Sequence, residues 1–164
     1  MKLFNKKKKM EDDLAFSIGA PVKGKVIDIK ETNDEMFKIE ALGKGVGIIA
    51  QSHTITAPIS GTITSFFPTK HAIGITNSKG VELLIHIGID TVELNGQYFH
   101  AKKKQGDFVT RGEVLLDVEF ENILQAGYDN TVLMVITNTA QYKDVITFSG
   151  DKEANEIVIE IEEK

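Results

Sequence analysis

The feature that most constrains the fold is a series of short segments rich in Val, Ile, Thr and Phe, separated by Gly, Asn, Asp, Ser or Pro. This pattern predicts eight short β-strands, at residues 25–30, 45–50, 61–67, 71–76, 81–87, 114–120, 132–137 and 156–161. One short helix is expected at residues 121–126, where Gly127 can end it. The expected fold is an all-β, single-domain antiparallel β-sandwich or barrel-like structure with at most short helices.

An internal repeat favours a sheet with two similar halves. Residues 20–26 read APVKGKV, and residues 57–63 read APISGTI. Each copy combines a proline, which is tolerated at a sheet edge, with a glycine turn and the start of a new strand. We therefore expect the two copies to occupy related positions.

Composition narrows the class of protein. The chain has 164 residues, enough for one sizeable core, and it contains no cysteine, which excludes disulfides, thiol nucleophiles and thiolate metal sites. Its longest apolar stretch, residues 81–89, is interrupted by Glu82 and His86 and is far shorter than the roughly 18 residues of a membrane-spanning helix. The N-terminus also lacks the apolar core of a secretory signal, so we expect a cytoplasmic protein.

Positive charge is concentrated at the N-terminus. The first ten residues hold five lysines and no acidic residue. The net charge of the whole chain is −5, so the remaining residues together carry a charge of −10. We interpret residues 1–15 as a flexible basic tail and residues 16–164 as one domain. The acidic body argues against nucleic-acid binding. A weak membrane-surface contact of the tail is the alternative to a solvated arm, with lysines facing anionic lipid and apolar contact from Leu3, Phe4 and Met10.

Two of the four histidines, His71 and His86, are placed to form a pair. They flank the turn signal NSKG at residues 77–80, between two predicted strands. If the hairpin is centred between Ser78 and Lys79, as a two- or four-residue loop requires, the two histidines lie directly opposite each other. Their Cβ atoms would then be about 4.5–5.5 Å apart. Two imidazolium ions would repel, so we expect at least one ring to be neutral near pH 7.

Three interpretations of the pair are open at this point. The rings are ordinary sheet residues, or one is a nucleophile for phosphoryl transfer while the other donates a hydrogen bond, or both join a carboxylate in a metal site. The same register pairs Ile73 with Leu84. His53 and His100 lie in polar contexts and are expected on the surface or in loops.

The residues around the pair resemble a known family. The segments FPTKHAIG at residues 67–74 and GVELLIHIGIDTVEL at residues 80–94 are similar to the glucose-type enzyme IIA of the bacterial phosphoenolpyruvate:sugar phosphotransferase system. The APxxGxI motif from residue 57 and the GxxVxxGxxL motif from residue 106 also match. The resemblance implies a β-sandwich of the duplicated-hybrid-motif type and a phosphotransferase component. In the implied reaction, HPr donates a phosphoryl group to a histidine of IIA, which passes it to the IIB domain of a sugar permease.

The resemblance also assigns roles to individual residues. His86 matches the phosphorylated histidine, His71 matches the residue that steadies the phosphoryl group, and Thr69 matches the hydroxyl that orients His71. The positions on which HPr and IIB dock are matched by Asp34, Phe37, Phe67, Leu84, Asp90 and Val92. No cofactor is required, although His71 and His86 could bind zinc. We expect a monomer, because a relay must present one accessible face to each partner.

Two other functions are compatible with the same residues. In some bacteria this type of IIA, when unphosphorylated, binds and inhibits sugar permeases or kinases, so a regulatory binding protein is the alternative. A zinc peptidase of related β architecture is disfavoured, because His86 and Asp90 match half of its metal motif but the required His-x-His pair is absent. Biotin and lipoyl carriers share the GxxVxxGxxL turn, but the chain has no lysine in a fitting motif at a hairpin tip.

Overall fold

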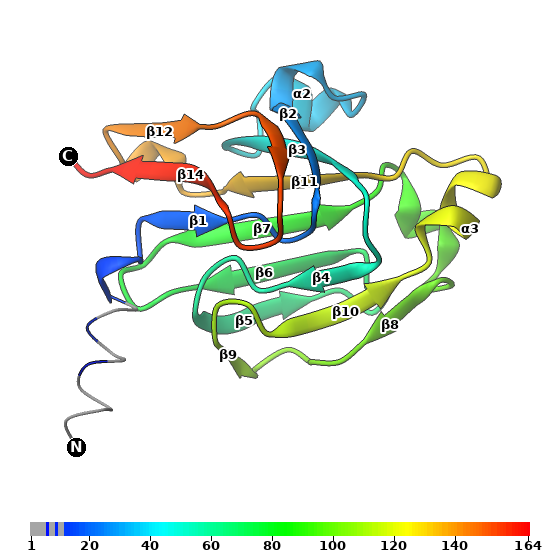
Figure 1. Cartoon of the computed structure of the whole chain (residues 1–164), viewed down its shortest axis with the longest axis horizontal. Coiled ribbons are helices and arrows are strands. Elements are labelled where there is room, and N and C mark those ends of the chain that lie inside the picture. Colours follow the sequence, from blue (N-terminus) through cyan, green and yellow to red (C-terminus); the bar gives the residue numbers. More distant parts are fainter. Residues whose placement is uncertain (1–5, 7–8, 10–11) are drawn as a thin grey trace.

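The structure, a computed structural model, describes residues 6, 9 and 12–164 and consists mainly of antiparallel strands (Figure 1). The largest sheet has eight strands, in the order β13 (Gly150–Lys152), β2 (Gly24–Asp28), β3 (Lys44–Ala50), β11 (Thr131–Ile136), β7 (Glu82–Ile87), β6 (Ala72–Thr76), β5 (Gly61–Phe66) and β9 (Phe108–Val109). One small sheet contains β1 (Ser17–Gly19), β14 (Ile157–Glu162) and β12 (Asp144–Thr147). The other contains β4 (Thr54–Thr56), β10 (Val114–Val118) and β8 (Phe99–Ala101).

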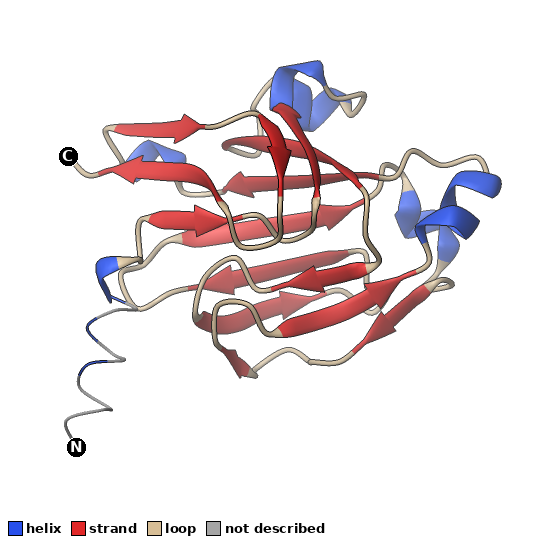
Figure 2. Ribbon diagram, viewed as in Figure 1, coloured by secondary structure: helices blue, strands red, loops and turns tan. Residues whose placement is uncertain are grey.

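The helices are short, as Figure 2 shows. Within residues 14–164 they are α2 (Glu35–Lys38), α3 (Phe120–Gln125) and the 3-10 turns η1 (Ile29–Glu31), η2 (Thr91–Leu94) and η3 (Thr139–Gln141). The predicted helix corresponds to α3, and Gly127 follows it in the left-handed conformation, with φ +94°. Within the described part of the chain, no helix has the length and apolar character needed to span a membrane. The predicted all-β sandwich with short helices is confirmed.

One apolar core lies between the large sheet and the two small ones. Along β7, Leu83, Ile85 and Ile87 point into it, and β1, β4, β10 and β14 supply residues from the small sheets. Side chains alternate between the two faces of a strand, so the opposite face of the large sheet carries a separate set. This outer cluster contains Ile29, Phe37, Ile89, Leu133 and Val135, with Leu84 packed against it. It seats α2 on the outer face, the face that His86 also occupies.

The large sheet has two similar halves, as the internal repeat predicts. Strands β2 and β5 each start at the glycine of an Ala-Pro motif, and they are second from opposite ends of the sheet. The two motifs also contact each other in a reciprocal way. The backbone N–H of Gly19 donates to the carbonyl of Pro58 (3.1 Å), and that of Thr56 donates to the carbonyl of Pro21 (2.8 Å).

All eight predicted strands are present, and their ends lie within two residues of the predicted ones. They are β2, β3, β5, β6, β7, β10, β11 and β14. The sequence pattern missed six others, each of four residues or fewer: β1, β4, β8, β9, β12 and β13. Segments of that length are too short to show a periodic apolar pattern.

The predicted register of the β6–β7 hairpin is wrong by one residue. Ala72, not His71, lies opposite His86. Ile73 pairs with Ile85, one position away from its predicted partner. His71 itself precedes β6 and lies in a bend.

The register differs because the hairpin loop has an odd length. The backbone N–H of Asn77 donates to the carbonyl of Val81 (3.1 Å), which leaves three residues in the loop. The last of them, Gly80, has φ +84°, as expected for a three-residue loop that ends in a left-handed residue. The side chain of Asn77 accepts hydrogen bonds from the N–H groups of Lys79 and Val81 (both 3.0 Å), which stabilises this loop.

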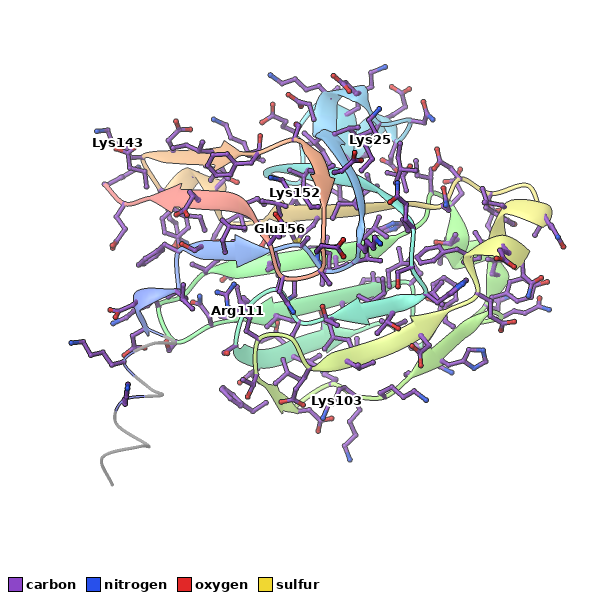
Figure 3. All side chains as sticks on the ribbon, in the orientation of Figure 1. Lys25, Lys103, Arg111, Lys143, Lys152 and Glu156 are labelled. Atoms are coloured by element: carbon purple, nitrogen blue, oxygen red, sulfur yellow. The ribbon has the colours of Figure 1, made fainter. Side chains whose placement is uncertain are left out.

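The end of the predicted tail contacts the body of the protein. Ala15 is buried, and its carbonyl accepts a hydrogen bond from the side chain of Asn77 (2.8 Å). Nη2 of Arg111 donates to the carbonyls of Leu14 (2.8 Å) and Ser17 (2.6 Å), and Figure 3 shows this arginine beside β1. The residues expected to touch a membrane lie outside the described part of the chain: Leu3, Phe4 and Met10.

Candidate functional site

His71 and His86 meet on the outer face of the large sheet. Their ring centroids are 4.9 Å apart and the ring planes are inclined at 82°. His86 points outward from β7, whereas His71 reaches it from the bend before β6. Lys70 adopts a left-handed conformation (φ +61°), and the carbonyl of His71 accepts a hydrogen bond from the N–H of Ile87 (2.7 Å). The rings are therefore close together although the two residues are not cross-strand partners.

Hydrogen bonds orient both rings. Nδ1 of His86 lies 2.8 Å from the carbonyl oxygen of Gly88. A carbonyl can only accept, so this Nδ1 carries a proton, and Nε2 of the neutral ring keeps its lone pair. Nδ1 of His71 lies 2.6 Å from the hydroxyl of Thr69. In both histidines, Nε2 is the ring nitrogen left for another partner.

Burial favours the neutral form of both rings. The pKa of His71 is lowered to about 4, by burial first and then by the neighbouring His86. Burial also lowers the pKa of His86, against the opposing effects of the Gly88 carbonyl and of the carboxylates of Asp34 and Asp90. Both rings are therefore neutral near pH 7, and a neutral Nε2 of His86 is a nucleophile.

The two acidic side chains flank His86. One carboxylate oxygen of Asp34 accepts hydrogen bonds from the N–H groups of Met36 (3.0 Å) and Phe37 (3.2 Å), so Asp34 caps the first turn of α2. Asp90 is exposed at the start of η2 and has φ +62°. A neutral histidine pair between two carboxylates suits a partner with a positively charged face.

The four apolar residues assigned to docking differ in exposure. Phe67 is 46% exposed and Val92 is 47% exposed, so both offer apolar surface. The ring of Phe67 lies 5.4 Å from that of His71, close enough for its exposed part to border the pair. Leu84 is half-buried, and Phe37 is only 3% exposed, with its ring 5.3 Å from that of His86. Phe37 therefore supports the histidine more than it forms surface.

Three further apolar side chains belong to the same region and were missed from the sequence. Met36 is 53% exposed, Ile39 is 68% exposed and Leu42 is 36% exposed, all in or just after α2. A helix of four residues is too short for a periodic pattern to separate its buried and exposed sides. The signal that could have identified them is the density of apolar residues in an otherwise charged segment.

The other two histidines lie elsewhere on the surface. His53 is exposed in a bend, and His100 is exposed in β8, where Nε2 lies 2.7 Å from the carboxylate of Glu119. Both are surface residues, as predicted. Among the described residues, no group of three or more His, Asp or Glu is placed to hold a metal ion. His71 and His86 by themselves offer two nitrogen ligands.

Comparison with known proteins gives a consistent result. A family model described as "phosphoenolpyruvate-dependent sugar phosphotransferase system, EIIA 1" matches residues 16–142. The chain is 43% identical over 140 residues to the β-glucoside-specific EIIBCA component of Bacillus subtilis, covering 85% of this chain and 22% of that protein. It is 38% identical over 145 residues to the glucose-specific EIICBA component of Staphylococcus saprophyticus, covering 88% of this chain and 21% of that protein. The chain thus spans about a fifth of the length of these curated relatives.

A solved structure agrees with the family match. Glucose permease IIA from Mycoplasma capricolum superimposes with a TM-score of 0.83 and 35% sequence identity, covering 87% of this chain and 93% of that one. The match includes the β-sandwich, and the family model spans the segments that hold both histidines. The chain therefore belongs to the EIIA type 1 family of the phosphoenolpyruvate-dependent sugar phosphotransferase system.

Proposed function

We propose that this chain accepts a phosphoryl group from phospho-HPr on Nε2 of His86 and passes it to the IIB domain of a sugar permease. Members of its family are phosphotransferase components that carry phosphoryl groups. The observation that carries the assignment to His86 is the 2.8 Å contact between its Nδ1 and the carbonyl of Gly88. That contact fixes the tautomer in which Nε2 has the lone pair, next to a second neutral imidazole.

The reaction needs no oxidant and no metal. The lone pair of His86 Nε2 forms the new N–P bond while the bond between phosphorus and the carrier's atom breaks, and that atom keeps the electron pair. In the second step the roles reverse: the acceptor on IIB forms the new bond, and Nε2 recovers its lone pair. The proton stays on Nδ1 of His86 throughout, and Nδ1 donates it in a hydrogen bond to the Gly88 carbonyl. Transfer of this kind depends mainly on positioning and on stabilising charge on the phosphoryl oxygens.

His71 is the proposed source of that stabilisation. If the Thr69 hydroxyl donates to Nδ1 of His71, the ring proton lies on Nε2, which can then donate to a phosphoryl oxygen. The low pKa of His71 supports this role, because the ring stays neutral at pH 7 and keeps this fixed arrangement of donor and acceptor. Thr69 thereby sets the tautomer of its neighbour.

The surroundings of the pair form the proposed docking surface. Phe67 and Val92 offer exposed apolar area, Leu84 is half-buried beside His86, and the carboxylates of Asp34 and Asp90 can meet an arginine of the incoming carrier. We assign Phe37 a supporting position under the ring of His86. The exposed residues of α2 extend the surface.

The functional unit is proposed to be residues 16–164, acting as a monomer in the cytoplasm without binding nucleic acid. Strands β13 and β14 follow the segment matched by the family model. Strand β13 pairs with β2, and β14 pairs with both β1 and β12. Val158 and Ile159 of β14 are buried in the core. The end of the chain is thus part of the same fold. A zinc ion bound by His71 and His86 with a partner's carboxylate, and a weak membrane contact of residues 1–15, remain proposals from the sequence.

The test is phosphorylation by phosphoenolpyruvate, enzyme I and HPr, read by intact mass. The wild type and His71→Gln should each gain one acid-labile phosphoryl group, and His86→Ala should gain none. Onward transfer to IIB should be impaired in His71→Gln. A labelled His86→Ala variant would refute the assignment of the nucleophile, and an unlabelled wild type would refute the proposed function.

A further inference from the structure

A short segment between α3 and β11 lies against the loop that carries Asp34. The carboxylate of Asp129 accepts hydrogen bonds at both of its oxygens. Oδ1 accepts from the backbone N–H of Thr131 (2.8 Å) and from its hydroxyl (2.6 Å). Oδ2 accepts from the side-chain amide of Asn33 (3.0 Å), the residue just before Asp34. One carboxylate therefore joins the start of β11 to a loop that is 96 residues away in the sequence.

The backbone of the same segment holds the turn that follows His86. The carbonyl of Asp129 accepts from the N–H of Ile89 (3.1 Å), and the carbonyl of Thr131 accepts from the N–H of Gly88 (3.0 Å). Gly88 in turn supplies the carbonyl that fixes the tautomer of His86. Segment 129–131 thus lies between the loop that carries Asp34 and the turn that orients the phosphorylated nitrogen.

The electrostatics agree with a carboxylate that acts as an acceptor. Burial opposes its ionisation, but the hydrogen bonds from Thr131 and Asn33 outweigh this effect and hold the pKa of Asp129 below its usual range. Among the described residues, Asp129 forms no ion pair, so neutral donors alone satisfy its charge. Hydrogen bonds to a charged acceptor are stronger than those between neutral groups.

A purely local role would account for only part of this arrangement. An aspartate that accepts from the N–H two residues ahead is a common turn former, and the contacts with Thr131 fit that description. The contact with Asn33 does not, because it crosses between distant segments and adds nothing to the turn. It ends on the loop that places Asp34 and Phe37 next to His86.

We propose that Asp129 is a positioning residue for phosphoryl transfer, acting through Asn33 to hold the Asp34–Phe37 segment in place beside His86. The proposal rests on the proposed function of His86. The side chain of Asp129 makes its hydrogen bonds with Asn33 and Thr131 and not with either histidine of the pair. Its effect is transmitted by the loop, so a change at Asp129 should alter how well the carrier binds to this loop.

The expected effect is on recognition of the carrier more than on the chemical step. Loss of the Asn33–Asp129 hydrogen bond frees a loop that includes a docking carboxylate, so KM for phospho-HPr should rise about 3- to 10-fold. The value of kcat should change less, because His71, Thr69 and the Gly88 carbonyl keep their places. A general loss of folded protein would instead lower the active fraction and leave KM unchanged.

The experiment compares Asn33→Ala, Asn33→Asp and the exchange variant Asn33→Asp/Asp129→Asn. Asn33→Ala removes only the donor on an exposed residue, so it should fold. Asn33→Asp places two carboxylates face to face, and the exchange variant restores an amide–carboxylate hydrogen bond with its direction reversed. Initial rates with phospho-HPr give kcat and KM, and thermal melts verify folding. Asp151→Asn, at an exposed position in β13, is the control.

The outcomes separate this inference from the proposed function. A raised KM in both single variants, with recovery toward the wild-type value in the exchange variant, supports Asp129 as a positioning residue. Unchanged KM in the single variants, or an exchange variant as impaired as Asn33→Asp, overturns it while leaving the phosphohistidine assignment intact. A wild-type protein that accepts no phosphoryl group overturns both.

Discussion

His71 should make the stability of this protein sensitive to mild acid. Its side chain is 4% exposed, and its pKa is lowered to about 4, from 6.5 in an unfolded chain. Between these two values the unfolded state binds more protons than the folded state, so the free energy of unfolding falls as the pH falls. Relative to pH 7, the loss due to this one residue is about 2 kcal/mol at pH 5 and about 3 kcal/mol at pH 4.

The perturbation that isolates this effect is His71→Gln, which removes the titrating group and keeps a polar side chain of similar size. Urea unfolding of both proteins at several pH values between 7 and 4 gives the free energy of unfolding. The carboxylates contribute equally to both proteins and cancel in the comparison. We expect the wild type to lose about 2–3 kcal/mol more than the variant over this interval.

A direct measurement accompanies the unfolding curves. Titration of the histidine ring signals by NMR should show one ring that stays neutral down to about pH 4 and that is absent in His71→Gln. Parallel pH profiles for the two proteins would refute the reasoning. So would a His71 ring that titrates near the ordinary value for histidine.

Three further predictions concern Thr69, Arg111 and Gly88. Thr69→Val removes the hydroxyl that contacts His71, and it should slow onward transfer to IIB about 5- to 10-fold in a stopped-flow assay. Thr69→Ser keeps a hydroxyl and should keep the wild-type rate. Equal rates in the two variants would contradict the role of the hydroxyl. Arg111→Met removes two hydrogen bonds to backbone carbonyls and should lower the free energy of unfolding by about 2 kcal/mol in urea with unchanged phosphorylation, whereas an unaltered urea midpoint would show that these bonds contribute little. Gly88 has φ +77°, and Gly88→Ala would place a methyl group 2.5 Å from the methyl of Thr91. This variant should lower the free energy of unfolding by about 1–3 kcal/mol and slow phosphorylation. Gly80→Ala, at φ +84° with open space around it, should be milder and leave phosphorylation intact, so similar behaviour of the two variants would count against this view of Gly88.

The candidate site shows where sequence reasoning was sufficient and where it was not. The closeness of His71 and His86 was predictable because a strong turn signal lies between them, and a turn brings the strands on either side together. The register was not, since it depends on whether the loop holds an even or an odd number of residues. The loop is odd, and its length is stabilised by the side chain of Asn77. The two rings are in contact despite the one-residue difference in register, because His71 lies outside the strand, where side chains need not alternate strictly between the two faces.

Exposure was a second point that the sequence left open. Phe37 and Phe67 were assigned to one docking surface, yet Phe37 is buried next to His86 while Phe67 is almost half exposed. The difference arises because α2 packs on the outer face of the large sheet through a cluster that includes Leu133 and Val135. These residues are distant from α2 in the sequence, so no local pattern records the contact.

The sequence by itself determined the all-β class, the main strands, the two related halves and the identity of the histidine pair. These follow from local strand and turn preferences and from short motifs, and neighbouring residues suffice to encode them. The tertiary structure alone decided the lowered pKa of His71, the burial of Phe37 and the contact between Asn33 and Asp129. Each of these depends on segments that are far apart in the chain and meet only when the sheets pack. Burial is a property of that packing, and it is the main reason that both histidines are neutral.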